Sequence, residues 1–180
     1  MKVCVQQFNV YLALITALSL LCGCETEKHK NTNAAALRVH IEARADNTGS
    51  TQTISVLRSD PVVVTIAKEF VLTEANVVAA KIIEVPGGFA IQIQFDENGS
   101  WVLEQYSATN PGKHFVIFGQ WGDKLSDGRW LAAPLITHRL ANGALSFTPD
   151  ASREEAEQLV AGLNTVARKT LHTNLMNLQK

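Results

Sequence analysis

The side chains most suited to metal or acid–base chemistry in this sequence are its five histidines, at positions 29, 40, 114, 138 and 172. A helix that binds a metal usually presents two ligands three or four residues apart, so that both lie on one face. No two of these histidines have that spacing. The sequence therefore predicts no metal site. We expect His114 and His138, which adjoin predicted strands, to occupy surface or capping positions.

Covalent and phosphate chemistry have no signature in this sequence either. No Gly-x-Ser-x-Gly nucleophile elbow occurs. The pair Gly87-Gly88 leads into a strand-like run, so it lacks the helix N-terminus that would bind a phosphate. The acids Asp96 and Glu97 precede a predicted helix, where carboxylates stabilise the helix dipole. We expect neither enzyme activity nor a cofactor.

One segment carries side chains suited to binding a peptide or a sugar. Residues 120–130 contain Trp121 and Trp130 around a Gly- and Asp-rich centre, with Arg129 beside the second ring. Tryptophan and arginine are enriched among the residues that dominate binding interfaces. The candidate binding residues are therefore Trp121, Arg129 and Trp130. The alternative is that both rings fold back onto a sheet, whereas Trp101, at the start of a predicted helix, is expected in the core.

Alternating and β-branched runs predict the first strands. Residues 37–42 alternate strictly, and residues 62–66 form a β-branched run. Residues 46–50 are a turn cluster, so residues 53–57 are the expected partner of the first strand. Residues 81–95 read as a hairpin because proline and glycine interrupt two strand-like runs.

Three helices and three further strands complete the expected elements. Thr73 is a suitable N-cap for a short helix over residues 73–80. A second helix opens at residues 98–100 and ends at the Asn-Pro-Gly of residues 110–112. A third begins at residues 148–151 and keeps an apolar face as far as residue 167. The further strands are expected at residues 114–118, 130–136 and 144–147.

The N-terminus predicts the protein's location. Lys2 precedes an apolar run over residues 10–21 that is short for a membrane span. Gly23 before Cys24, with leucine three residues before the cysteine, resembles the bacterial lipobox. That resemblance implies a signal peptide over residues 1–23 and a diacylglycerol on the sulfur of Cys24, which anchors the chain to a membrane without spanning it. The alternatives are an ordinary cleaved signal peptide and an uncleaved N-terminal helix.

Residues 24–36 have no apolar period and are expected to be a flexible tether from the lipid to the folded domain. The residue that follows Cys24 is Glu25 and not an aspartate. By resemblance to Gram-negative sorting, this favours the outer membrane, facing the periplasm. The folded domain is expected over residues 37–169, with a weakly helical tail over residues 170–180.

The charge and the cysteines of the mature chain limit its partners and its source of stability. Without Lys2, the chain keeps 15 basic and 17 acidic side chains, a balance that predicts no nucleic-acid binding. Cys4 and Cys22 leave with the signal, so no disulfide is possible within the mature chain. We expect the domain to depend on its hydrophobic core alone.

Five short segments, in a fixed order, resemble one known family; they are residues 95–99, 109–113, 133–136, 143–148 and 155–156. Each is turn chemistry or core packing, and the Ala-Pro-Leu-Ile of residues 133–136 matches the family's Ala-Pro-hydrophobic-Ile element. Over residues 73–168 the chain resembles the head of the large periplasmic domain of SecD, an accessory subunit of the Sec protein-export machine. The segment 120–130 departs from the family, which has a tight Asp-Gly turn there.

The resemblance implies an α+β fold in the ferredoxin-like style, with helices on one face of an antiparallel or mixed sheet. The element order expected from the residues gives the same class. The resemblance also implies a non-catalytic domain that contacts emerging polypeptides, because proton coupling in the translocase uses membrane segments that this chain lacks.

Two functions follow from these expectations. The first is a lipid-anchored, non-catalytic envelope module that contacts polypeptides, for which an exposed sheet edge would provide strand addition. The second is a structural or assembly lipoprotein that binds one fixed protein partner. An unpaired strand edge or an exposed tryptophan pair would favour the first function. An apolar patch on the tail helix, at Leu171, Leu175 and Leu178, would favour the second.

Overall fold

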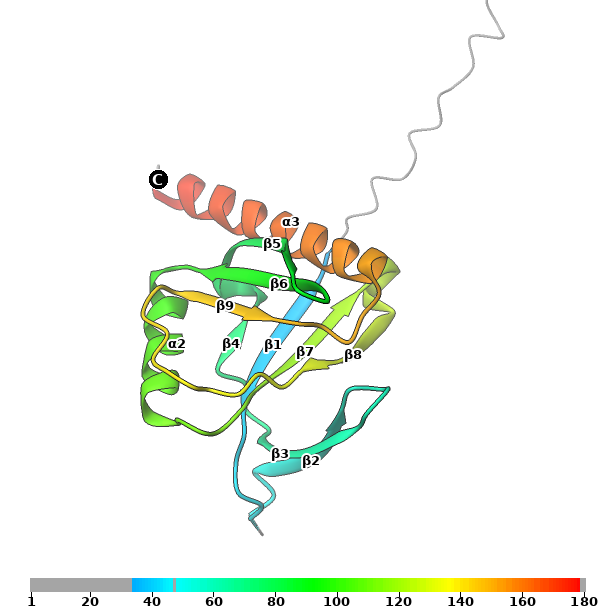
Figure 1. Ribbon diagram of the computed structural model, residues 1–180. Helices are drawn as coiled ribbons and strands as arrows, with labels where there is room; N and C mark the ends of the chain where they lie inside the picture. Colours follow the sequence, from blue (N-terminus) through cyan, green and yellow to red (C-terminus); the bar gives the residue numbers. More distant parts are fainter. Residues whose placement is uncertain (1–33, 47, 179–180) are drawn as a thin grey trace, which may run out of the picture. The chain divides into compact units, whose positions relative to one another are not determined.

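The computed structural model describes residues 34–46 and 48–178 (Figure 1). The predicted signal segment, Cys24 and the tether up to residue 33 lie outside the described residues. The folded domain includes residues ahead of the expected boundary at residue 37, since Ala35 is buried and Ala36 pairs with Gln120.

The larger of two sheets in the main body has the strand order β4-β1-β7-β8, with every pair antiparallel. Its strands are β4 (Leu72–Thr73), β1 (Ala36–Ile41), β7 (Phe115–Trp121) and β8 (Asp127–Ala132). Pro134 follows β8, and Leu135 forms an isolated antiparallel bridge with His114. The chain thus stays paired with the start of β7 beyond the end of β8.

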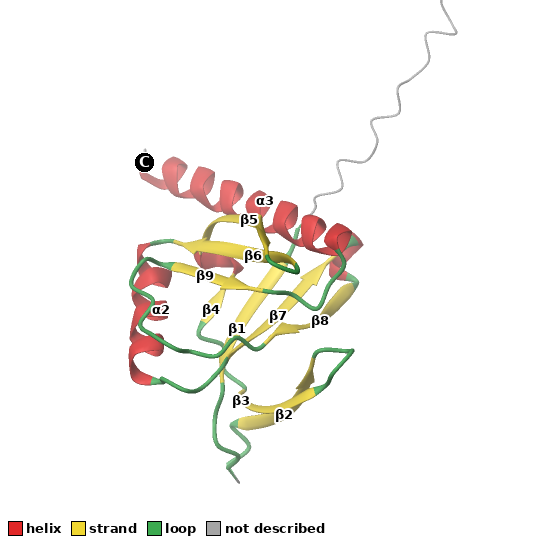
Figure 2. Cartoon of the chain, viewed as in Figure 1, coloured by secondary structure: helices red, strands yellow, loops and turns green. Residues whose placement is uncertain are grey.

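The second sheet has the order β5-β6-β9 and is also antiparallel. Its strands are β5 (Val77–Val85), β6 (Gly88–Phe95) and β9 (Ala144–Phe147). The helix α2 (Glu97–Thr109) packs against β6 and β4, and α3 (Arg153–Leu178) lies along β5 and contacts β1 and β7 (Figure 2). The predicted α+β class is confirmed.

A separate two-stranded hairpin consists of β2 (Thr51–Val56) and β3 (Val62–Ala67). The prediction that β2 pairs with β1 is wrong, because β1 pairs with β4 and β7 instead. The apolar residues Val56, Val64 and Ile66 of the hairpin pack with Val116 of β7 in a cluster of their own. The hairpin therefore covers part of one face of the larger sheet.

The main hydrophobic core lies on the opposite face of the larger sheet, between that sheet, the second sheet and the two helices. Alternation along the strands puts Leu37 and Val39 into this core, and the apolar face of α3 contributes Leu159 and Leu163. All four side chains are at most 1% exposed. With no disulfide among the described residues, this burial is the main source of stability.

The expected helix over residues 73–80 is wrong. Thr73 does act as an N-cap, since its side chain accepts from the Ala75 N–H, but the helical segment is only the 3₁₀ turn η1 (Glu74–Asn76). The β-branched pair Val77-Val78 then enters β5. Tertiary pairing with β6 overrides the capping signal.

The outer edge of β5 is closed by a side chain of α3. The Asn164 carboxamide accepts from the Ala80 N–H at 2.8 Å and donates to the Ala80 carbonyl at 2.9 Å. It thereby replaces one residue of a neighbouring strand, and no further chain can pair at that position. Within the described residues, no helix combines the length and apolar character needed to cross a membrane.

Candidate binding surfaces

The first candidate binding residue, Trp121, is a core residue. It ends β7, its side chain is 2% exposed, and it belongs to the main hydrophobic core. The expected long surface loop is short, because β7 extends to Trp121 and β8 begins at Asp127. Only residues 122–126 form the connection, which contains the 3₁₀ turn η2 (Asp123–Leu125).

Arg129 is also occupied within the fold. Its guanidinium lies 5.0 Å from the centre of the Trp121 ring and forms an ion pair with Glu155 of α3. The Glu155 carboxylate accepts from the Ser152 N–H as well, which together with Arg129 lowers the pKa of that carboxyl. Arg129 therefore fastens β8 to the start of α3, and its charge is not available to a ligand.

Trp130 differs from Trp121 because it faces the other side of the larger sheet. Its ring is half-buried and makes edge contacts with Phe118 and His40, at centroid distances of 5.1 and 5.3 Å. The hairpin β2–β3 covers part of the ring, and the remainder lines a groove of ≈ 260 Å³. We call this hollow the aromatic groove; it is lined by Arg38, His40, Gln52, Lys68, Phe70, Phe118 and Trp130.

Trp101, expected in the core, is 61% exposed on α2. Leu103 is the residue of that helix that enters the core. The core position expected for Trp101 is thus wrong, whereas Trp121 follows the alternative in which its ring folds back onto the sheet. Of the three candidate binding residues, the structure leaves only Trp130 at a hollow on the surface.

His40 is a buried member of the aromatic groove. Its Nδ1 lies 2.9 Å from the Ala67 carbonyl oxygen, which ties β1 to the end of β3. Burial lowers the pKa of His40 below its usual value of 6.5, and the hydrogen bond to Ala67 only partly offsets this. The imidazole is consequently neutral at pH 7.

The pKa of His40 predicts a loss of stability in mild acid. Because the folded value is depressed, the unfolded chain binds a proton first as the pH falls below 6.5, so the contribution is complete above that pH and declines below it. The urea midpoint should fall between about pH 7.5 and 5.5. In His40→Gln, the fall in the urea midpoint should be smaller than in the original protein. In the control His172→Gln, which alters an exposed histidine of α3, the fall should equal that of the original protein. An equal fall in His40→Gln and in the original protein would exclude this role.

The strand β9 has an unpaired outer edge. The Phe95 N–H donates to the Gly143 carbonyl at 3.0 Å, so the odd-numbered residues of β6 direct their backbone groups at β9, where Leu145 and Phe147 are their partners. Ala144 and Ser146 must then direct their backbone groups away from β6. The Ala144 N–H donates to the Asn142 side chain at 3.1 Å.

The other backbone groups on this edge are unpaired. Among residues 34–46 and 48–178, the Ala144 carbonyl and both backbone groups of Ser146 have no hydrogen-bond partner. An exposed row of such groups is where another chain can add a strand. Unlike the edge of β5, this edge is not covered by either helix of the described part of the chain.

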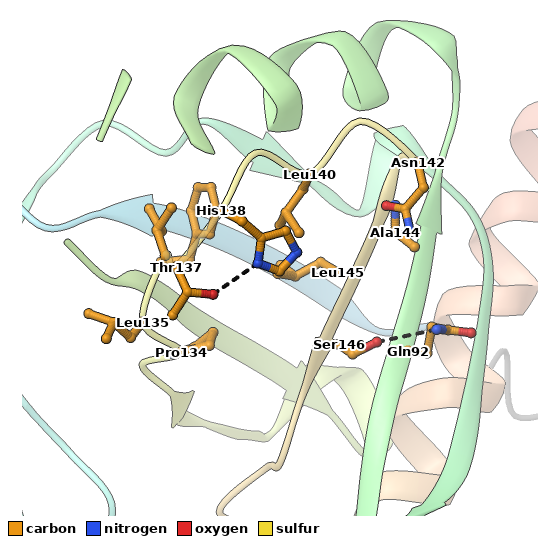
Figure 3. Close-up of a pocket in the computed structure, with 12 residues that line it drawn as sticks. Gln92, Pro134, Leu135, Thr137, His138, Leu140, Asn142, Ala144, Leu145 and Ser146 are labelled. Atoms are coloured by element: carbon orange, nitrogen blue, oxygen red, sulfur yellow. Dashed lines mark hydrogen bonds between the residues drawn. The ribbon is translucent and has the colours of Figure 1, made fainter. Parts of the chain in front are cut away.

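A pocket of ≈ 300 Å³ runs along the unpaired edge of β9 (Figure 3). Ser146 and Gln92, which share a hydrogen bond, lie on one side of it, and Thr137 and His138 lie on the other. Leu135, at the rim, is 52% exposed. We call this hollow the edge pocket. It offers backbone groups together with apolar surface, as an extended peptide requires.

Neither hollow contains a catalytic arrangement. The Thr137 hydroxyl lies 2.9 Å from His138 Nδ1 in the edge pocket, but none of the described residues brings a carboxylate to that pocket to orient the imidazole. In the part of the chain that the structure describes, no three His, Cys, Asp or Glu side chains lie close enough together to hold a metal ion. The Nδ1 of His114, just before β7, lies 2.6 Å from a carboxylate oxygen of Glu42, just after β1, and this hydrogen bond joins the two strands.

Comparison with protein families matches residues 47–167 to the model described as the SecDF P1 head subdomain. The chain belongs to this family. The match extends the resemblance found in the sequence towards the N-terminus, so that it includes the hairpin β2–β3. A search of curated proteins finds no match.

Solved structures of SecDF share the fold of the head subdomain. One, described as a membrane component SecDF that enhances protein export, has 20% identity and a TM-score of 0.51 over 74% of this chain and 64% of that chain. A second, SecDF in a super-membrane-facing form, has 20% identity and a TM-score of 0.52 over 74% of this chain and 19% of that chain. This chain therefore spans less than two thirds of the length of either SecDF chain.

Two features of this SecDF head were not predicted from the sequence. The residues that line the aromatic groove are spread in the sequence between positions 38 and 130. They lie close together only because of the order of the strands in the sheet. The strand β9 was predicted, but its position at the edge of a sheet was not. No local sequence signal distinguishes an edge strand of four residues from an inner strand.

Proposed function

We propose that this protein is a lipid-anchored, non-catalytic envelope protein whose SecDF head domain contacts extended polypeptides. The unpaired edge of β9 beside the edge pocket is the observation that supports this most. Membership of the SecDF P1 head family supports a role near protein export. The domain would hold segments of envelope or exported proteins and would leave force generation to other components.

In this proposal, a ligand segment becomes the fourth strand of the β5-β6-β9 sheet. It would pair with the backbone of Ser146 and with the Ala144 carbonyl, and it would place alternate side chains against Leu135 and Leu140. Backbone hydrogen bonds do not depend on the ligand's sequence. Strand addition therefore suits a protein that meets many different polypeptides.

The proposed anchor is Cys24, in the outer membrane facing the periplasm, with the N-terminal segment as a tether. The variant Cys24→Ala is expected to lose incorporation of radiolabelled palmitate and to leave the membrane fraction. Cys4→Ala, which alters the predicted signal segment, should keep both the label and the membrane location. Retention of the label in Cys24→Ala would contradict the anchor.

A second function, assembly with one fixed partner, is favoured by apolar side chains at the C-terminal part of α3. Leu171 is 62% exposed and Met176 is 53% exposed, and Val78 of β5 is 56% exposed. Leu171 and Val78 line the same hollow. A partner helix or loop could cover these side chains.

Crosslinking in whole cells separates the two functions. A photo-reactive residue at Leu135, on the rim of the edge pocket, should give adducts with many different proteins if the domain contacts polypeptides in general. The same residue at Leu171 tests the second function. One discrete adduct at Leu171, with none at Leu135, would favour the assembly function and overturn the proposal.

Proline at position 146 should block strand addition without removing a backbone hydrogen bond within the sheet, although it removes the side-chain hydrogen bond between Gln92 and the Ser146 hydroxyl. Ser146→Pro deletes an N–H that points away from β6, and edge strands tolerate such prolines. We expect the Leu135 adducts, and the binding of an unfolded polypeptide to the purified full chain, to fall at least about tenfold.

The matched control is Ser55→Pro on the outer edge of β2. The Ala43 N–H donates to the Thr65 carbonyl, so Thr65 and its partner Thr53 direct their backbone groups away from each other, and Ser55 follows the same alternation. This control should bind as the original protein does. Equal binding by Ser146→Pro, Ser55→Pro and the original protein would exclude the β9 edge as the contact site.

A further inference from the structure

The aromatic groove is lined by two positively charged side chains, Arg38 and Lys68. Arg38 and Lys68 are both exposed, and among the described residues neither forms an ion pair with a carboxylate. The Arg38 guanidinium lies over the Phe70 ring, 5.6 Å from its centre. No acidic side chain of residues 34–46 or 48–178 lines the groove. The groove is therefore electropositive at its rim.

The floor and walls of the aromatic groove are apolar rings that stay partly uncovered. Phe118 and Trp130 are half-buried, and Phe70 is 45% exposed. Gly128, on β8 opposite Gln120, helps to keep this face open, since a Cβ there would lie 3.3 Å from the Phe118 ring. His40 fixes the ring arrangement through its contacts with Trp130 and Phe70.

The size of the aromatic groove limits its ligand. Its ≈ 260 Å³ is below the range of about 300–1,000 Å³ that is usual for small-molecule sites. Such a space accommodates one or two side chains of a longer ligand. Two unpaired cations beside aromatic rings complement a carboxylate next to an apolar or aromatic side chain.

We propose that the aromatic groove binds extended peptide segments in which Asp or Glu lies two residues from an aromatic or large apolar residue, so that both side chains point to the same side of the segment. The ring of the segment packs against Trp130 and Phe118, and its carboxylate pairs with Arg38 and Lys68. This inference rests on the proposed function, which makes polypeptides the ligand. It adds a preference for sequence that strand addition at β9 does not provide.

The test measures the binding of two labelled peptides to the full chain in detergent by fluorescence anisotropy. One peptide repeats Glu-Ser-Phe-Ser, which puts Glu and Phe on the same side of the extended chain, and its twin repeats Gln-Ser-Phe-Ser. The acidic peptide should bind at least about tenfold more tightly, and added salt should reduce the difference. Equal affinities for the two peptides would overturn the proposal.

Charge reversal assigns the preference to the groove. The double variant Arg38→Glu/Lys68→Glu should lose the preference for the acidic peptide. The matched control Arg168→Glu/Lys169→Glu makes the same change of charge on exposed positions of α3 and should keep it. If the reversed variant has a lower urea midpoint, Arg38→Gln/Lys68→Gln replaces it. A preference that survives both groove variants would also overturn the proposal.

The outcomes separate this inference from the proposed function. If both peptides bind equally and Ser146→Pro weakens both, the β9 edge contacts polypeptides and the aromatic groove does not select them. If neither peptide binds, and unfolded proteins do not bind either, both proposals fail. A glucuronate oligosaccharide that binds in place of the acidic peptide would assign the groove to a glycan and overturn the inference.

Discussion

Replacing Trp121 with alanine is expected to lower the free energy of unfolding by about 3–5 kcal/mol. The side chain is 2% exposed, and its removal would leave a large cavity between β7 and α3. It would also remove the ring over which the Arg129 guanidinium lies. The measurement is urea unfolding of the full chain, followed by circular dichroism in the far ultraviolet.

The control for this prediction is the same substitution at Trp101. Because that ring is 61% exposed on α2, Trp101→Ala should change the free energy of unfolding by no more than about 1 kcal/mol. The two variants remove identical side chains, so their difference measures burial directly. Equal losses would mean that Trp121 does not lie in the core, and the residue would again be a candidate for binding.

Gly143→Ala is expected to have the second-largest effect, about 2–4 kcal/mol. Gly143 has a φ of +66°, which an alanine adopts only with strain. An added Cβ would also lie 2.8 Å from the Ser100 Cβ at the start of α2. The same residue accepts the hydrogen bond from Phe95 that sets the register of β9. The variant should therefore also weaken polypeptide binding at the edge pocket.

Gly49→Ala separates the two causes of that loss. Gly49 has a φ of +77°, but nothing lies within 4 Å of the Cβ that alanine would add. Its cost should be only the conformational part, about 1–2 kcal/mol. If urea unfolding gives the two variants equal losses of unfolding free energy, the steric clash between the added Cβ at position 143 and Ser100 does not contribute to the loss.

Elements set by local chemistry were predictable from the sequence. The hairpin β5–β6 follows from its Pro-Gly-Gly turn, and α2 ends at the Asn-Pro-Gly that predicted its end. The apolar residues Ile91, Ile93 and Phe95 alternate along β6 and all enter the core. These features depend on neighbours in sequence, and a single sequence contains them.

Strand pairing was not predictable in the same way. The turn at residues 46–50 favoured a hairpin between β1 and β2, yet β1 pairs with β7, more than 70 residues away. The pairing of β1 buries Leu37 and Val39 in the main core, a gain that only the complete fold provides. Thr73 does cap a helical turn, but the helix expected over residues 73–80 is wrong for a similar reason, since Val77 and Val78 pair in β5.

The candidate binding site was predicted only in part. Trp130 does line a hollow, but Trp121 does not, although β7 and β8 place both near the same hairpin connection. The two rings lie on opposite faces of one sheet, and the face is decided by the register between β7 and β8. That register includes an irregularity between Ile117 and Phe118, which no sequence pattern indicated.

In the two proposals, the edge pocket binds the backbone of a ligand and the aromatic groove binds its side chains. The β9 edge supplies hydrogen bonds that any extended chain can make. The groove supplies rings and two cations that favour some sequences over others. Every ligand should then contact Ser146, and the ligands that also contact Arg38 and Lys68 should bind more tightly.

The most direct test is amide hydrogen exchange at Ser146, measured by NMR on the full chain with and without an unfolded polypeptide. The Ser146 N–H has no partner within the described residues and should exchange quickly in the unbound protein. On binding, its exchange should slow at least about tenfold, while the Ser55 N–H of β2 should be unchanged. Unaltered exchange at Ser146 under conditions where the polypeptide is bound would contradict strand addition at β9.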